Sequence, residues 1–274
     1  MTTGSERRLV LAASVVGNPR ITELVAAAVD AGYDALSLWP AAGYGAAREH
    51  RHIIEDAGLF VFDVDALVSW IGPDDPGSPY FEEAPADVVW AAADALGATS
   101  VNVLLVGARG VPLDAVIERF AALADAAAER GARLTVEFGR GTAVPDLPTA
   151  AHVVADAGRA NAGLLLDAWN LYWSGARPSD VGRLPGHHVH GLQLSDAPAE
   201  RPEHLAHASR YHREMPGTGV ADNAGLVATL DAIGSHGPLV VEAFNGPLLE
   251  QHGAAGYARL LADALRSVRD RATS

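Results

Sequence analysis

The sequence contains neither cysteine nor lysine, and each absence excludes a class of chemistry. Without cysteine the chain can form no disulfide and offers no thiolate nucleophile or thiolate metal ligand. Without lysine it can hold neither a Schiff-base intermediate nor a lysine-bound pyridoxal phosphate, because both need a side-chain amine. Every one of its 20 basic residues is an arginine.

Positive charge and long apolar runs are also scarce. The chain carries 34 acidic residues against 20 basic ones, a formal net charge of −14. This charge argues against a nucleic-acid partner and against an anionic membrane surface, since both would need a basic face. No apolar run reaches the roughly 18 residues of a membrane helix, and no signal-peptide pattern is present. We expect a cytoplasmic protein with a small-molecule substrate, and its Ala-rich helices are compatible with a homodimer.

The chain alternates eight apolar runs with Ala-rich amphipathic segments. The runs predict buried strands at residues 9–14, 35–38, 59–65, 100–105, 134–138, 162–167, 189–194 and 238–244. The segments predict helices at residues 19–31, 46–57, 85–96, 113–130, 149–157, 178–184, 224–234 and 255–269. Eight such units of about 30 residues fit a single (β/α)8 TIM barrel of about 250 residues. The competing doubly wound sheet would need a ligand crevice at one switch point.

Four polar side chains stand at the ends of the last four apolar runs. Glu137 ends LTVE, Asp167 ends LLLD, Gln193 ends GLQ and Glu242 ends LVVE. The carboxyl ends of barrel strands meet at one face, so we expect these side chains to converge. Carboxylate and amide oxygens form a hard site for a divalent cation, and Mg²⁺ or Mn²⁺ is the expected ion. Two longer irregular segments, 66–84 and 195–223, follow strands and should lie on the same face.

Other roles for these residues remain open from the sequence. An inward Glu137 costs desolvation unless it is paired, and Arg140 could be its salt-bridge partner. Asp167 could cap the segment that follows it, with the neighbouring aromatic residues forming a lid. Gln193 is the least usual metal ligand of the four.

Two further polar residues precede a Pro-Gly-x-Gly turn in the long segment after the seventh strand. They are His212 and Arg213, and the arginine could present its fork to a substrate carboxylate or hydroxyl. A solvated loop pair is the alternative interpretation. In the seventh strand, alternation puts Gln193 on the inner face and His190 on the opposite face, toward the helices.

Five stretches resemble the sugar phosphate isomerase/epimerase superfamily with the xylose-isomerase-like TIM barrel. They are LTVEF, GLLLDAWNLYWSG, GLQLSDAP, YHREMPGTG and GPLVVEAF, and the resemblance covers nearly the whole chain. It implies a divalent metal held by Glu137, Asp167, Gln193 and Glu242. A branch resembling 3-dehydroshikimate dehydratase has Gln as third ligand in the same QLxDAP context. The resemblance also implies a role for Arg213 in substrate binding.

The chain departs from the family pattern in two places. Asn170 stands where the family usually has the His of an Asp-x-x-His motif, and Asn cannot titrate near neutral pH. Trp173 stands where many relatives have an arginine. A different base would then be needed, and the candidates are His212 and the carboxylates of Glu137 and Glu242.

The resemblance implies a metal-dependent isomerase, epimerase or dehydratase. Its substrate would be a hydroxy-ketone, sugar-like or a cyclic polyol, that reacts through a metal-stabilised enediolate. The candidate catalytic residues are Glu137, Glu242, His212 and Asn170, and the candidate substrate-binding residues are Arg213, Trp39, Trp169 and Trp173. The alternative is a barrel that has lost proton-transfer catalysis and serves as a binding or accessory subunit.

Overall fold

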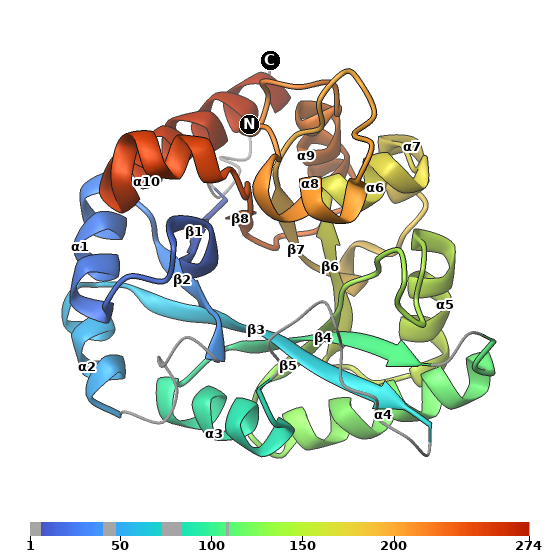
Figure 1. The fold of residues 1–274 in the computed structure, drawn as a ribbon. Helices are drawn as coiled ribbons and strands as arrows, with labels where there is room; N and C mark the ends of the chain where they lie inside the picture. The colour runs from blue at the N-terminus through green and yellow to red at the C-terminus, as the bar shows by residue number, and fades with distance from the viewer. Residues whose placement is uncertain (1–6, 41–47, 73–83, 108–109, 274) are drawn as a thin grey trace.

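Each predicted apolar run forms a strand, and the strands close into a parallel barrel surrounded by helices (Figure 1). The computed structural model describes residues 7–40, 48–72, 84–107 and 110–273. Every strand pairs with its sequence neighbours, and β1 pairs with β8 to close the ring. The prediction of a (β/α)8 TIM barrel is confirmed.

Seven of the strands have three to eight residues, and β3 has 12. They are β1 (Leu9–Ala12), β2 (Ala35–Leu38), β3 (Phe60–Ile71), β4 (Ser100–Gly107), β5 (Arg133–Val136), β6 (Ala162–Asp167), β7 (Val189–Leu194) and β8 (Leu239–Val241). Glu137 and Glu242 lie one residue beyond the ends of β5 and β8, while Asp167 is the last residue of β6.

The helices form the outer ring. The α-helices are α1 (Ile21–Ala31), α2 (Arg48–Asp56), α3 (Ala86–Leu96), α4 (Leu113–Ala128), α5 (Leu147–Ala157), α6 (Ala168–Ser174), α7 (Pro178–Val181), α8 (Leu205–Tyr211), α9 (Asn223–Ala232) and α10 (Gly246–Ala272). Two short 3-10 helices are η1 (Ala13–Val16) and η3 (Gly186–His188). None of the described helices is long and apolar enough to cross a membrane.

Polar residues, prolines and glycines stand at the ends of several helices. Asp146 caps α5 by accepting a hydrogen bond from the backbone N–H of Thr149 at 2.9 Å, and Pro148 lies in the first turn. Gly32 ends α1 with φ of 73°, and Gly97 ends α3 with φ of 63°. These left-handed positions favour glycine, which has no Cβ to clash.

Four elements differ from the sequence prediction. Strand β3 runs six residues past the predicted end at 65, because residues 67–71 pair with β4. Helix α6 follows β6 directly, and α8 lies inside the segment predicted to be irregular. Helix α10 begins at Gly246 instead of 255 and is broken at Gly253, which has φ of 65°. Residues 46–47 of the second predicted helix and 73–83 of the segment after β3 lie outside the described residues.

The prediction that His190 faces the helices is wrong. Leu164 of β6 pairs with Val189 of β7, but the next residue of β6, Leu165, pairs with Gly191, so one residue of β7 has no partner in β6. His190 is that extra residue, so a β-bulge redirects its side chain. Its ring lies against Gly163, where an added Cβ would come within 2.6 Å of the ring. Gly163 shares the inward side of β6 with Asp167, so the ring faces the barrel interior.

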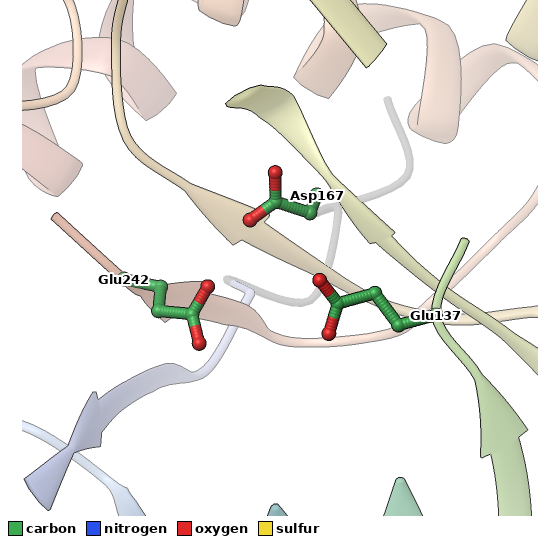
Figure 2. Close-up of side chains that lie close together, drawn as sticks. All are labelled: Glu137, Asp167 and Glu242. Atoms are coloured by element: carbon green, nitrogen blue, oxygen red, sulfur yellow. The ribbon is translucent and has the colours of Figure 1, made fainter. Parts of the chain in front are cut away.

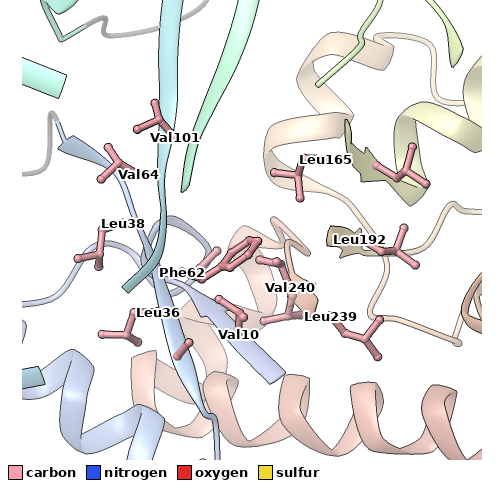
Figure 3. Close-up of a cluster of buried hydrophobic side chains, with 14 of the residues drawn as sticks. Val10, Leu36, Leu38, Phe62, Val64, Val101, Leu165, Leu192, Leu239 and Val240 are labelled. Carbon is pink, nitrogen blue, oxygen red and sulfur yellow. The ribbon is translucent and has the colours of Figure 1, made fainter. Parts of the chain in front are cut away.

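The core fills the barrel and the space between the barrel and the helices (Figure 3). Figure 3 shows that Phe62 and Leu165 belong to this core, and both would contact a Cβ added at inward-facing Gly191. Outside the barrel, α1 packs on α10, which buries Tyr257 and Leu261 completely. Apolar layers therefore separate the two open ends of the barrel.

We expect the Leu261→Ala substitution to lower the free energy of unfolding by about 2–5 kcal/mol, because it leaves a cavity under α10. Urea denaturation followed by circular dichroism would measure this loss. The control is Val29→Ala on α1, whose side chain is 47% exposed and should cost less than about 0.5 kcal/mol. Equal losses in the two variants would contradict this assignment of the core.

Candidate active site

Three carboxylates meet at the C-terminal end of the barrel (Figure 2). Glu137 follows β5, Asp167 ends β6 and Glu242 follows β8. Each contributes one carboxylate oxygen to a group of three oxygens that all lie within 4.8 Å of one another. All three side chains are nearly excluded from solvent. The parallel strands bring these residues together although up to 105 positions separate them in the chain.

Asp167 performs two structural tasks. Its Oδ1 accepts a hydrogen bond of 2.6 Å from the backbone N–H of Asn170 and so caps α6. Its Oδ2 accepts one of 2.7 Å from the guanidinium of Arg213. The capping role that the sequence left open is therefore present, and it fixes the carboxylate at the floor of the site.

Arg213 joins two of the carboxylates. Its Nη1 lies 2.7 Å from Asp167 Oδ2 and 3.2 Å from Glu242 Oε2, and its Nε donates to the backbone carbonyl of Ser209 at 2.6 Å. The guanidinium is buried, so these ion pairs are little screened by solvent. Arg213 thus offsets part of the repulsion between the acidic groups.

Glu137 is held by neutral amides instead of an arginine. Asn170 donates from Nδ2 to Glu137 Oε1 at 2.9 Å, and Asn102 donates to Oε2 at 3.1 Å. No ion pair joins it to Arg140, the partner considered from the sequence, and no other ion pair of Glu137 occurs among the described residues. Burial, and then the charge of Asp167, raise the pKa of Glu137 well above its ordinary value.

Gln193 lies beside Glu242. Its Nε2 donates to Glu242 Oε1 at 3.2 Å and to Asp65 Oδ2 at 3.0 Å. Its Oε1 is buried and accepts no hydrogen bond from the described residues. A buried acceptor without a donor is costly, which suggests that a further electropositive group belongs at this oxygen.

The sequence analysis missed a fourth carboxylate, Asp65 of β3. It accepts hydrogen bonds from Asn102 Nδ2 at 2.9 Å and from Gln193 Nε2. Burial raises the pKa of Asp65 to about 6. The missed signal was a pair of acidic residues, Asp63 and Asp65, inside the otherwise apolar run FVFDVDALV.

These residues fit a divalent cation. The donor atoms are hard oxygens, the carboxylates are buried close together, and a single arginine neutralises only part of their charge. A carboxylate oxygen that accepts one hydrogen bond keeps a second lone pair, so the bonds above leave room for a metal ligand. The orphaned Oε1 of Gln193 adds a candidate fourth donor.

A cavity of about 880 Å³ opens above the carboxylates. Glu137, Glu242, Asp65 and Arg213 line its floor, while Asp167 and Gln193 are buried and are not part of the lining. Four of the five tryptophans of the chain line the walls, and they are Trp39, Trp70, Trp169 and Trp173. The predicted residues Trp39, Trp169, Trp173, Asn170 and Arg213 therefore share one cavity.

His212 does not reach this cavity. Its side chain is exposed, it is absent from the lining, and its ring lies 5.3 Å from that of His207. No histidine contributes to the described lining of the cavity. A carboxylate is therefore the titratable group that remains at the floor.

Two lining residues present polar atoms without a partner among the described residues. They are Oδ1 of Asn18 and Nε1 of Trp173, and both atoms are buried. One accepts and the other donates hydrogen bonds. A ligand with several oxygen atoms would satisfy both.

The chain matches the family described as xylose isomerase-like TIM barrel over residues 25–268, and it belongs to this family. The resemblance seen in the sequence motifs is thereby confirmed. A 3-dehydroshikimate dehydratase of Pseudomonas aeruginosa is 37% identical over 124 residues, which is 45% of this chain and 19% of that protein. The chain thus spans about a fifth of the length of this relative.

Solved structures with the same fold include two that cover nearly the whole chain. The IOLI protein, solved with a zinc atom bound, has a TM-score of 0.79 and 18% identity, covering 97% of this chain and 98% of that chain. D-psicose 3-epimerase, solved in the presence of D-fructose, has a TM-score of 0.71 and 15% identity, covering 97% and 100%. At these identities the likeness shows the fold alone.

We expect Arg213→Gln to lower the free energy of unfolding by about 3–5 kcal/mol at neutral pH, because Asp167 and Glu242 would lose their buried cation. The loss should shrink as the pH falls, because the pKa of Glu242 is raised and its protonated carboxyl no longer needs that cation. Urea denaturation at several pH values would measure both effects. Arg183→Gln, which removes an 80% exposed arginine, is the control; a loss independent of pH would contradict the ion-pair explanation.

Proposed function

We propose that the protein is a divalent-metal-dependent enzyme that moves a proton next to the carbonyl group of a hydroxy-ketone. The reaction would be an isomerisation, an epimerisation or a dehydration. The observation that carries the proposal is the buried cluster of Glu137, Asp167 and Glu242, two of whose members, Glu137 and Glu242, line an aromatic cavity. The dehydratase among the similar proteins supports a dehydration, and an epimerase shares the fold.

Glu137, Asp167, Glu242 and the Oε1 of Gln193 would hold the metal, with Mg²⁺ or Mn²⁺ favoured by the oxygen ligands. When bound, the metal would polarise a substrate carbonyl and stabilise the negative charge that develops on its oxygen. Asp65 would keep the Gln193 side chain in place through its hydrogen bond to Nε2. Arg213 would fix Asp167 and Glu242 and present its remaining surface to the substrate.

Glu137 is our candidate for the proton-transfer group, with Glu242 as its partner across the floor. Glu137 lacks an arginine and has a pKa well above the ordinary value, because it is buried and lies near Asp167. A carboxylate with a raised pKa takes up a proton more readily than an ordinary carboxylate does. Asn170 would orient Glu137 through its hydrogen bond to Oε1, and it would not carry the proton itself.

The cavity favours a ring-shaped, polyoxygenated substrate. The faces of the tryptophan rings would pack against a ring of the substrate. Asn18 Oδ1 and Trp173 Nε1 have no hydrogen-bond partner among the described residues and would pair with substrate oxygens. Arg140 also lines the cavity and has no ion pair with the described residues, so it can receive a substrate carboxylate. A cyclic hydroxy-ketone acid such as 3-dehydroshikimate combines these features and is the first compound to assay.

We predict that the protein purified without chelator contains about one divalent ion per chain and that Glu137→Ala loses it. Metal binding must also release protons, because the pKa values of Glu137 and Glu242 are raised above the ordinary 4.5. Affinity for Mn²⁺ should therefore rise with pH. Elemental analysis and calorimetry in two buffers of different ionisation enthalpy would measure these effects. A metal-free protein that takes up no Mn²⁺ or Mg²⁺ would refute the metal site.

We predict that Glu137→Gln lowers turnover of the substrate at least about 100-fold, because the amide retains the shape of the side chain but can neither take a proton nor offer a carboxylate to the metal. Incorporation of deuterium from D₂O next to the carbonyl would report proton removal directly. The control is Glu118→Gln, which changes an exposed glutamate on α4. Undiminished exchange in Glu137→Gln would remove Glu137 from the proton-transfer role.

A binding or accessory protein is the second candidate. The absence of histidine from the described cavity lining, with Asn170 at the position of the family histidine, favours it. A protein of this kind would bind the ring compound and the metal without exchanging substrate hydrogen with solvent. The deuterium experiment on the unmodified chain therefore separates the two candidates.

A further inference from the structure

A second cavity, of about 960 Å³, lies at the opposite end of the barrel from the carboxylates. Residues at the beginnings of strands line it, from Arg8 before β1, Phe60 in β3, Arg133 in β5 and His190 in β7. Because all strands are parallel, these beginnings gather at the N-terminal face. The buried layers of the barrel separate this cavity from the proposed active site.

The lining of this cavity is basic in a strongly acidic protein. Five of the 20 arginines line it, against two carboxylates, although the whole chain carries a formal charge of −14. The arginines are Arg7, Arg8, Arg51, Arg130 and Arg133, and the carboxylates are Asp94 and Asp231. Gathering so many like charges is unfavourable unless an anion compensates for them.

Three of the five arginines have carboxylate partners. Arg7 pairs with Asp231 at 2.6 Å, Arg51 pairs with a glutamate of its own helix at 2.7 Å, and Arg130 lies 3.5 Å from Asp94. These pairs explain part of the cluster as structural support.

Arg8 and Arg133 have no carboxylate partner among the described residues. Arg8 stacks over the ring of Phe60, with 4.9 Å between its Cζ and the ring centroid. Arg133 begins β5, which lies across the barrel from β1. Two exposed guanidinium groups therefore flank the mouth of the cavity with their hydrogen-bond donors free.

His190 supplies a third polar group, and it is buried. Only 8% of the residue is exposed, and its Nδ1 has no hydrogen-bond partner among the described residues. The β-bulge of β7 turns the ring inward, and Gly163 leaves the space that the ring occupies. Burial, and then the positive charge of Arg133, lower the pKa of His190 to about 4. The charge of Arg133 thus acts on an imidazole that lines the same cavity.

We propose that this N-terminal cavity binds a phosphate-type oxyanion, either free phosphate or the phosphate group of a small metabolite. Arg133 and Arg8 would donate to the oxyanion from two sides, and the ring of His190, which lines the same cavity, would lie next to it. Guanidinium groups match the oxygen spacing of phosphate and keep their charge at any physiological pH. The site is independent of the metal cluster and of the proposed reaction.

The test is a titration of the protein with inorganic phosphate, observed through the ring signals of ¹³C-labelled histidine at constant ionic strength. We expect a saturable shift of the His190 signal, assigned with His190→Gln, and a rise in the pKa of His190, since a nearby anion favours the charged ring. Sodium chloride at equal ionic strength should produce neither effect. A His190 signal that does not respond, or that responds equally to chloride, would overturn the proposal.

Two charge-neutralising variants locate the binding groups. Arg133→Gln and Arg8→Gln should each weaken phosphate binding at least about 10-fold, and Arg183→Gln, on the exposed surface of the C-terminal half, should leave it unchanged. Having both variants keeps the test decisive if one fails to fold. Phosphate binding that persists unchanged in both would overturn the proposal. Addition of a phosphorylated metabolite in place of phosphate then separates the two sources, because a metabolite should bind more tightly.

Discussion

Burial of four carboxylates around a single arginine is the constraint on which the C-terminal end of this barrel depends. Asp167 and Glu242 share the guanidinium of Arg213, while Glu137 and Asp65 have no ion pair with the described residues. Removing so many charges from water is unfavourable, and like charges placed close together add to the cost. The pKa values of Glu137 and Glu242 are raised because their ionised forms are unfavourable in this buried cluster. A cation held between the carboxylates would relieve it.

Neutral amides keep the cluster together without changing its charge. Asn102 donates to both Asp65 and Glu137, Asn170 donates to Glu137, and Gln193 links Asp65 to Glu242. Each amide fixes the direction of a carboxylate while leaving the negative charge available for a metal. Asn170 fits this arrangement, because its neutral amide donates to Glu137 without adding charge to the cluster.

The two ends of the barrel have opposite character, although one set of strands builds both. The C-terminal end combines carboxylates with aromatic walls, and the N-terminal end gathers arginines and His190. Strand alternation explains how this is possible, since each strand can carry different inward residues at its start and at its end. Thus β5 places Arg133 at one end, and Glu137 follows it at the other. Apolar side chains such as Phe62 and Leu165 separate the charges.

The sequence by itself determined the barrel and the polar residues at or next to the ends of its last four strands, because the spacing of apolar runs and the residues that follow them are local signals. Tertiary structure alone decided which groups touch. Gln193 donates a hydrogen bond to Asp65, which lies 128 positions earlier in the chain. Arg213 contacts the buried carboxylates, while the adjacent His212 is exposed to solvent. A β-bulge in β7 directs the side chain of His190 inward. Strand register and the direction of a loop side chain depend on pairing between distant segments, and the order of residues along one segment does not contain that information.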